Sequence, residues 1–178
     1  MIKRIFVIIL FVYAFLTSAA QEVLTGIQEN ITIINALDNQ TDLSPKTNTH
    51  TPLFLPFKDD FSYQGPFPND SLWEDKFVFC NSTYQAFPCT KGVATFDALN
   101  DSGRIYSYAS QLPFIADYLT SNPIRLDTFL NGGIPTAVKI ADSIYFSFFY
   151  QPQGIGDAPE LEDFLVLDFF SVVDSMWH

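Results

Sequence analysis

Residues 143–151 carry the feature that most restricts the fold of this chain, a regular alternation of side chains between two faces. Ile144, Phe146, Phe148 and Tyr150 fall on one face, and the intervening residues fall on the other. A period of two residues indicates a β-strand, because successive side chains of a strand point to opposite sides of the sheet. The pattern therefore predicts paired strands rather than helices.

Strand-sized runs follow one another from residue 53 onward, where aromatic residues become frequent. Turn-forming residues separate the runs at 100–103, 131–133 and 154–157. No segment keeps a helical period with caps at its ends. These features predict an all-β sandwich. The expected strands are residues 76–80, 92–97, 104–108, 118–126, 136–140, 143–151 and 163–173.

Two of these runs depart from simple alternation. Residues 163–173 are apolar on both faces, with Asp168 as the acid inside the run, so this strand is expected to be covered on both sides. Residues 118–126 change phase at Asn122 and Pro123. A phase change beside a proline predicts a bulge, or a crossing between sheets on an edge strand.

Residues 1–20 have the pattern of a signal peptide. Lys3 and Arg4 precede an apolar run at 5–16, and small residues predict cleavage between Ala20 and Gln21. The apolar run is too short to span a membrane as a helix, and no later apolar stretch is long enough. We therefore expect export across the inner membrane, a secreted or cell-surface location, and no membrane span after cleavage.

The expected organisation is a signal peptide at 1–20, a polar leader at 21–52 and a β domain at 53–178. The leader is rich in Asn and Thr and is expected to be irregular, with one short strand at residues 31–34.

Composition excludes several classes of function. Twenty acidic residues against nine basic ones give a formal charge of −11, so nucleic acid would be repelled. Cleavage would remove two of the bases and leave a charge of −13. With 48% apolar residues, the chain has too much apolar mass for a disordered protein.

No catalytic constellation is evident. His50 lies in the leader and His178 is the last residue, which argues against a histidine-dependent triad. Glycoside hydrolysis needs two facing carboxylates, and no strand carries an alternating run of acids. We therefore predict no catalytic residues and no organic cofactor.

Cys80 and Cys89 would meet an oxidising compartment after export, which predicts a disulfide across a short hairpin-like loop. The alternative is two independent buried thiols. A zinc site is not expected, because no histidine lies near either cysteine.

Acidic residues in Pro- and Gly-rich loops raise the hypothesis of one structural calcium ion, because carboxylate and carbonyl oxygens are the ligands that calcium prefers. The alternative is acids that are simply solvated, which the lack of EF-hand-like spacing favours. The candidate ligands are Asp59, Asp60, Asp157 and Glu160.

Aromatic side chains could stack on sugar rings or meet another protein, although most aromatics of a sandwich form its core. We expect the phenylalanines and Trp73 to belong to the core and leave the tyrosines near Gly103 open. The residues considered are Tyr63, Phe67, Trp73, Tyr106, Tyr108 and Tyr150.

Five stretches, in order, resemble a group of exported Bacteroidetes-type surface proteins: LPFKDDFS at 55–62, GPFPNDSLWED at 65–75, GVATFDAL at 92–99, LTSNPIRL at 119–126 and SIYFSFFYQPQGIGDAPE at 143–160. That group is similar to MAM and concanavalin-like jelly rolls and is associated with type IX secretion. The resemblance covers residues 53–178 and implies an antiparallel β-sandwich of jelly-roll type. Because the group's pattern continues past residues 172–177, it also implies a sandwich that is incomplete at the C-terminus, in a truncated chain.

These observations predict an exported, non-catalytic surface or adhesion-type module that binds a surface glycan or another envelope protein. One alternative is an accessory or catalytic jelly-roll domain of a carbohydrate-active hydrolase. A second is a structural component of the envelope or the secretion machinery.

Overall fold

The computed structural model describes residues 27–39, 51–109, 113–156 and 158–178. Its strands are β1 (Leu53–Leu55), β2 (Phe79–Asn81), β3 (Val93–Thr95), β4 (Ile124–Asn131), β5 (Ile134–Ala137), β6 (Phe170–Ser171) and β7 (Met176–Trp177), and one helix, α2 (Ile31–Asp38), precedes them in the described residues. Regular structure is thus mostly β, as the sequence predicts. Within the described ranges no helix is long and apolar enough to cross a membrane, and the predicted signal peptide and cleavage site lie outside them.

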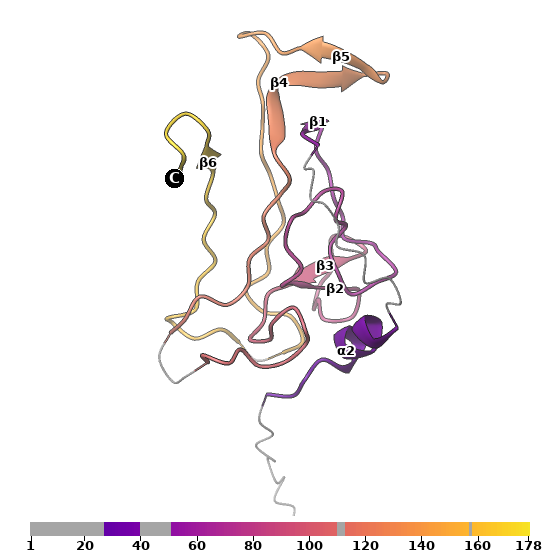
Figure 1. Ribbon diagram of the computed structural model, residues 1–178, viewed down its shortest axis with the longest axis vertical. Coiled ribbons are helices and arrows are strands. Elements are labelled where there is room, and N and C mark those ends of the chain that lie inside the picture. Colours follow the sequence, from indigo (N-terminus) through magenta and orange to yellow (C-terminus); the bar gives the residue numbers. More distant parts are fainter. Residues whose placement is uncertain (1–26, 40–50, 110–112, 157) are drawn as a thin grey trace, which may run out of the picture.

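The strands form three small sheets, with orders β1-β4-β5, β2-β3 and β6-β7. Figure 1 shows the β4–β5 hairpin at one end of the molecule and the β2–β3 pair close to α2. The prediction of purely antiparallel pairing is wrong for β1 and β4, which pair in parallel. Strands far apart in the chain meet here without a tight turn to impose an antiparallel direction.

The predicted turn at residues 131–133 is confirmed as the connection of the β4–β5 hairpin. Asn131 pairs with Ile134 across the ladder. Gly132 and Gly133 have φ angles of 58° and 86°. Two consecutive positive φ angles match the twist of a two-residue hairpin, and glycine adopts them without a steric penalty.

The predicted strand at residues 31–34 is wrong, because these residues form the first turns of α2. The Asn30 side-chain oxygen accepts hydrogen bonds from the backbone N–H groups of Thr32 at 3.0 Å and Ile33 at 3.3 Å. This N-cap satisfies donors that the first helical turn leaves unpaired. Ile33 is buried at 1% exposure, so tertiary packing selects the helix over the local β-preference of an isoleucine-rich segment.

The helix is docked through the turn at residues 100–103. The backbone N–H of Asn30 donates to the Gly103 carbonyl at 2.7 Å. Gly103 has a φ of +74°, and a Cβ there would lie 2.8 Å from the Asn30 carbonyl oxygen and 3.0 Å from the Ile33 Cβ. Glycine is thus required both by the backbone conformation and by the close approach of the helix.

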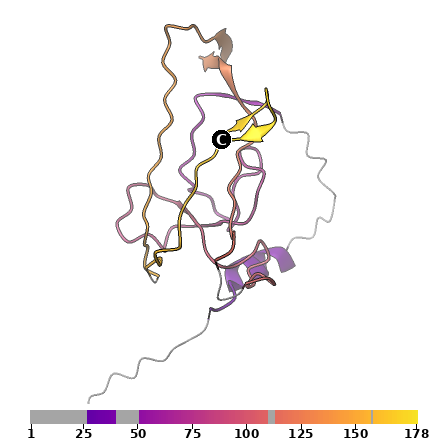
Figure 2. The same cartoon turned by 90° about the vertical axis from the view of Figure 1, so that its left-hand side faces the viewer.

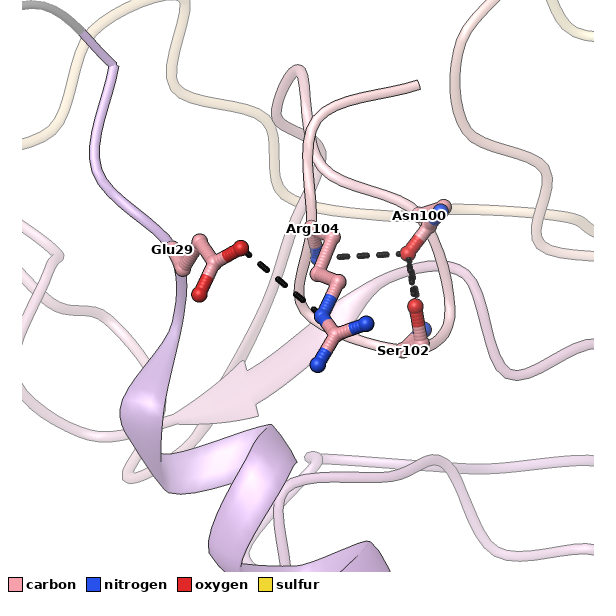
Figure 3. A network of polar contacts seen from close by, with 4 residues as sticks. All are labelled: Glu29, Asn100, Ser102 and Arg104. Atoms are coloured by element: carbon pink, nitrogen blue, oxygen red, sulfur yellow. Dashed lines mark hydrogen bonds and ion pairs between the residues drawn. The ribbon is translucent and has the colours of Figure 1, made fainter. Parts of the chain in front are cut away.

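Figure 3 shows how the side chain of Asn100 closes this turn. Its oxygen accepts hydrogen bonds from the Ser102 hydroxyl at 2.6 Å and from the Arg104 backbone N–H at 3.2 Å. The Arg104 guanidinium also lies 3.7 Å from the Glu29 carboxylate. Both of these charged side chains are more than half exposed, so this ion pair contributes little to stability.

The buried core is small and lies around β2, α2 and the loops between residues 97 and 122. Val78 is fully buried, and the backbone N–H of the buried Asn122 donates to the Leu72 carbonyl at 2.8 Å. The other buried side chains of the described residues are Ile33, Pro68, Phe79, Cys80, Leu99 and Tyr106.

Of the strand expected at residues 118–126, only the part from Ile124 onward is formed, as the start of β4. The expected edge position is wrong, because β4 lies between β1 and β5. Ser121 forms an isolated bridge with Trp73. The Pro123 carbonyl accepts from the Leu53 backbone N–H at 2.7 Å, and β4 begins at the next residue. The segment therefore crosses from one pairing partner to another at the proline.

Three other expected strands differ from the structure. Residues 104–108 contribute a single bridge, between Ile105 and Leu99. Residues 143–151 form no ladder, and of residues 163–173 only β6 is paired. Residues 143–150 and 164–168 are extended, as their alternation predicts, but they make no ladder hydrogen bond to a described strand.

Substitution Asn30→Ala is expected to lower the free energy of unfolding by about 1 kcal/mol, because it removes the N-cap of α2. Urea unfolding at fixed pH measures this loss. Asn35→Ala, at an exposed position inside the same helix, is the matched control and is expected to be neutral or slightly stabilising. Equal stability of the two variants would contradict the capping role of Asn30.

Gly103→Ala is expected to destabilise the protein by about 1–3 kcal/mol, through backbone strain and contact with α2. Gly133→Ala is the control, since its φ is also positive but no atom lies within 4 Å of the added Cβ. Thermal unfolding of both variants isolates the contribution of helix docking. A loss at Gly103 no larger than the loss at Gly133 would refute the tight docking of α2.

Candidate functional site

Two extended segments, residues 143–150 and 164–169, form the most unusual surface of the molecule, and we call them the open strand pair. Figures 1 and 2 both show them running lengthwise along the molecule after β5 and before β6. The rings of Phe146 and Phe169 meet edge to face with their centroids 5.7 Å apart. This contact places the two segments beside each other.

Both ends of residues 143–150 are anchored. Ahead of the segment, the backbone N–H of Val138 donates to the Asp127 carbonyl of β4 at 2.8 Å. Beyond it, the Gln151 side chain donates to the Phe87 carbonyl and the Ile155 backbone N–H donates to the Tyr84 carbonyl, each at 2.8 Å. The segment is thus stretched between the β4–β5 hairpin and the connection that joins β2 to β3.

Residues 164–169 are held in the same way. The backbone N–H of Asp163 donates to the Glu160 carbonyl at 3.1 Å and closes a turn before the segment. After it, Phe169 and His178 exchange backbone hydrogen bonds of 2.9 and 3.1 Å at the base of the β6–β7 hairpin.

Between these anchors the backbone is unpaired. In the part of the chain that the structure describes, the N–H and C=O groups of residues 143–150 and 164–168 make no hydrogen bond. A strand normally satisfies these groups by pairing, and exposed unpaired edges invite pairing with another chain.

The side chains of the open strand pair are also uncovered, so the expectation that residues 163–173 are covered on both sides is wrong. The face that holds Phe146 and Leu167 is about half exposed, at 58% and 49%. The opposite face is more open, with Phe149 at 77% and Phe164 at 80%. An apolar patch of this extent is typical of a protein interaction site.

The surroundings of the open strand pair are acidic. The sequence from residue 142 to the end contains seven acidic residues and no Lys or Arg. Asp168 lies within the apolar run, is exposed, and makes no hydrogen bond or ion pair with any described residue.

A second cluster joins two carboxylates that lie twenty residues apart in the sequence. The Asp117 carboxylate accepts hydrogen bonds from the Asp97 backbone N–H at 2.7 Å and from the Tyr106 hydroxyl at 2.8 Å. Burial raises the pKa of Asp117 to about 7, and the charge of Asp97 acts in the same direction. Burial also raises the pKa of Asp97. Both oxygens of Asp117 are engaged by the protein itself, so this carboxylate braces the loops around Tyr106.

The acidic loop at residues 59–60 is likewise engaged by the fold. Asp59 accepts a hydrogen bond from the Trp73 indole N–H at 2.6 Å and another from the Tyr63 hydroxyl. Asp60 accepts from the Ser62 hydroxyl at 2.6 Å, and this hydrogen bond holds the pKa of Asp60 below its usual value.

For the calcium hypothesis, no group of three or more acidic, His or Cys side chains in the described ranges is placed to hold a metal ion. Asp59 and Asp60 therefore do not form such a group with Glu160, which is exposed. The fourth predicted ligand, Asp157, lies outside the described residues. The calcium site stays an untested prediction.

The predicted disulfide is not formed in the structure, where Cys80 and Cys89 are both free. Cys80 is buried on β2 and Cys89 is exposed in the following loop, so one thiol faces the core and the other faces solvent. Burial, together with the nearby charge of Asp59, raises the pKa of the Cys80 thiol to about 12. Cys80 is therefore a protonated core side chain at neutral pH.

The predicted aromatic binding residues are dispersed. Trp73 packs against Phe57 and Phe61, with ring centroids 5.3 and 5.6 Å away, but it is only half-buried. Among the described phenylalanines only Phe79 is buried, so the expectation that the phenylalanines and Trp73 belong to the core is wrong for most of them. The Phe67 ring faces the Lys76 ammonium at 5.6 Å.

The tyrosines also differ from one another. Tyr106 is buried, whereas Tyr108 is 57% exposed beside it and packs edge to face on Phe114. Tyr63 is half-buried against Asp59. Tyr150 is the only one of the six candidate aromatics, all of them described, that belongs to the open strand pair.

Comparison with known proteins adds no relative: no family model matches the chain, and no curated protein and no solved structure matches it. The expected relationship to exported jelly-roll proteins therefore stays a prediction.

The two clusters differ in how far the sequence indicates them. The sequence shows the alternation at residues 143–151 and the apolar residues on both faces of 163–173. It does not show that both segments lack hydrogen-bonding partners. The Asp97–Asp117 pair has no sequence signal, because the two acids lie in separate loops and share no motif.

The Asp117 carboxyl predicts a pH dependence of stability. An unfolded Asp titrates near ~3.9, whereas folding raises the pKa of Asp117 to about 7. The folded chain thus binds this proton more tightly, so the free energy of unfolding is expected to fall as pH rises from about 4 through 7. Asp117→Asn is expected to flatten this slope and leave the smaller part that Asp97 contributes. Urea unfolding at several pH values between 4 and 8 measures both slopes.

Asp127→Asn serves as the control for this series. The hydrogen bond from Arg125 lowers the pKa of Asp127 to about 2, and an unfolded Asp titrates at about 3.9, so above about pH 5 Asp127 is ionised in both states. The control is expected to keep the parent slope. A parent slope that Asp117→Asn leaves unchanged would show that Asp117 is not the titrating group.

Proposed function

We propose that this protein is an exported, non-catalytic surface module that binds a partner protein through its open strand pair. The observation that carries the proposal is that residues 143–150 and 164–168 present unpaired backbone groups and exposed apolar side chains together. A partner strand added to this edge would supply both hydrogen bonds and apolar cover, as in β-strand addition.

Magnitudes favour a protein over a sugar as the partner. Fully covering one exposed Leu or Phe side chain contributes about 1.5–3 kcal/mol, so covering several is of the same order as the roughly 4–15 kcal/mol that association costs. The open strand pair also presents unpaired backbone along two segments, which a strand of another protein can match with a row of hydrogen bonds. In the fold that we propose, the added strand completes a jelly-roll type sandwich.

Export and surface location rest on the residue pattern at 1–20, and type IX secretion rests on the resemblance alone. The absence of a catalytic role is proposed from the missing triad and from the engagement of Asp117 and Asp59 by the protein's own hydrogen bonds.

Site-specific photo-crosslinking tests the proposal. Phe149, 77% exposed on the open strand pair, is replaced by p-benzoylphenylalanine in the full chain displayed by its native cells. We expect one discrete protein adduct. The same replacement at Ile27, 60% exposed and outside the pair, is expected to give none.

A substitution pair ties the adduct to strand addition. Ser147→Pro removes a backbone N–H that has no partner in the described structure, so it is expected to abolish the adduct while the unfolding midpoint stays within a few degrees. Ser147→Ala keeps the N–H and is expected to keep the adduct. Phe148→Asp, which adds a charge to the apolar face, is a second disrupting variant. Persistence of the adduct in both disrupting variants, or binding only to a glycan array, would overturn the proposal.

A further inference from the structure

We infer that the strand bound by the open strand pair belongs to another protein and carries a Lys or Arg that pairs with Asp168. This inference rests on the proposed function and specifies the chemistry of its partner. It begins from the position of Asp168, the acid inside the apolar run of residues 164–169.

The alternation of side chains along residues 164–169 determines which residues lie on the same face as the Asp168 carboxylate. Asp168 shares a strand face with Phe164 and Val166, which are 80% and 58% exposed. A strand that pairs with this segment places its own side chains beside these apolar neighbours and beside Asp168, and so withdraws part of the carboxylate from water. In the described part of the chain the carboxylate has no hydrogen bond and no ion pair to compensate for that change.

A buried carboxylate without a partner is costly, whereas a cation on the incoming strand converts this cost into a specific contact. Opposite charges across neighbouring strands stabilise pairing, and like charges directly opposite destabilise it. The uncovered acid within the strand therefore selects for a basic residue at the facing position.

The same reasoning decides against a second copy of this chain that binds through the same surface. After Lys139 the sequence contains no Lys or Arg, so neither segment of the open strand pair could supply the cation. Two copies would instead bring their acidic regions together, seven acidic residues from each, and repel one another. Charge thus disfavours a second copy paired through this surface, and the occupant that we infer is a strand of another protein, alternating in apolar residues and basic at the facing position.

Peptide binding to the full mature chain tests this inference. The probes are capped nine-residue peptides of alternating Val and Thr that carry one Lys, moved through successive positions to sample register, and the same set with Glu. Fluorescence anisotropy gives the dissociation constants. We expect the best Lys peptide to bind at least about tenfold more tightly than its Glu counterpart, because close charge pairs at interfaces contribute 1.4 kcal/mol or more.

Variants of the acid assign the effect to its position. Asp168→Asn is expected to reduce the preference for Lys to less than about twofold while the peptides still bind, and Asp168→Lys is expected to reverse it toward Glu. Glu162→Gln, which removes an exposed acid outside the pair, is the control and is expected to retain the preference.

The outcomes separate this inference from the proposed function. Equal binding of Lys and Glu peptides, or a preference that survives Asp168→Asn, overturns the inference, whereas loss of all peptide binding in Ser147→Pro would still support strand addition. Self-association in sedimentation that Ser147→Pro abolishes also overturns it, in favour of a second copy. If no peptide binds while the crosslinked adduct at position 149 persists, the inference fails and the proposed function stands.

Discussion

The need of an extended backbone for hydrogen-bonding partners governs this structure. Where a segment finds such partners, as in β4 between β1 and β5, it forms a ladder and positions its neighbours. Where it finds none, at residues 143–150 and 164–168, the same alternation of apolar residues gives an open edge. The distinction between scaffold and interaction surface in this protein follows from that one requirement.

The compact part of the molecule depends on polar side chains as much as on its small apolar core. Asn30 and Asn100 close the ends of a helix and a turn, and the turn then holds the helix through Gly103. Asp117 links two loops by accepting from both Asp97 and Tyr106. These contacts hold loops in place where few fully buried residues are available, and they also explain why acids that look chemically available in the sequence are occupied in the fold.

Local chemistry made some elements predictable. The glycines at 132 and 133 define the β4–β5 hairpin because few other residues tolerate two positive φ angles in succession. The turn at residues 100–103 is defined by the Asn100 side-chain hydrogen bonds and by the positive φ of Gly103. The helix at Ile31–Asp38 was not predictable from β-branched composition, since the Asn30 cap and the burial of Ile33 outweigh that preference. The free thiols of Cys80 and Cys89 likewise follow from the burial of Cys80 on β2 and the exposure of Cys89 in the following loop, and spacing along the chain does not report that.

By itself, the sequence determined that the chain is mostly β, where its tightest turns fall, and that its last segments are extended and apolar, because these properties depend on the period of side chains and on residues with restricted backbone angles. Only the tertiary structure decided that β1 meets β4 in parallel, that Asp97 and Asp117 share one half-buried site, and that residues 143–150 and 164–168 stay unpaired. These outcomes depend on which distant segments come together, and that is set by the packing of the whole chain rather than by any local pattern.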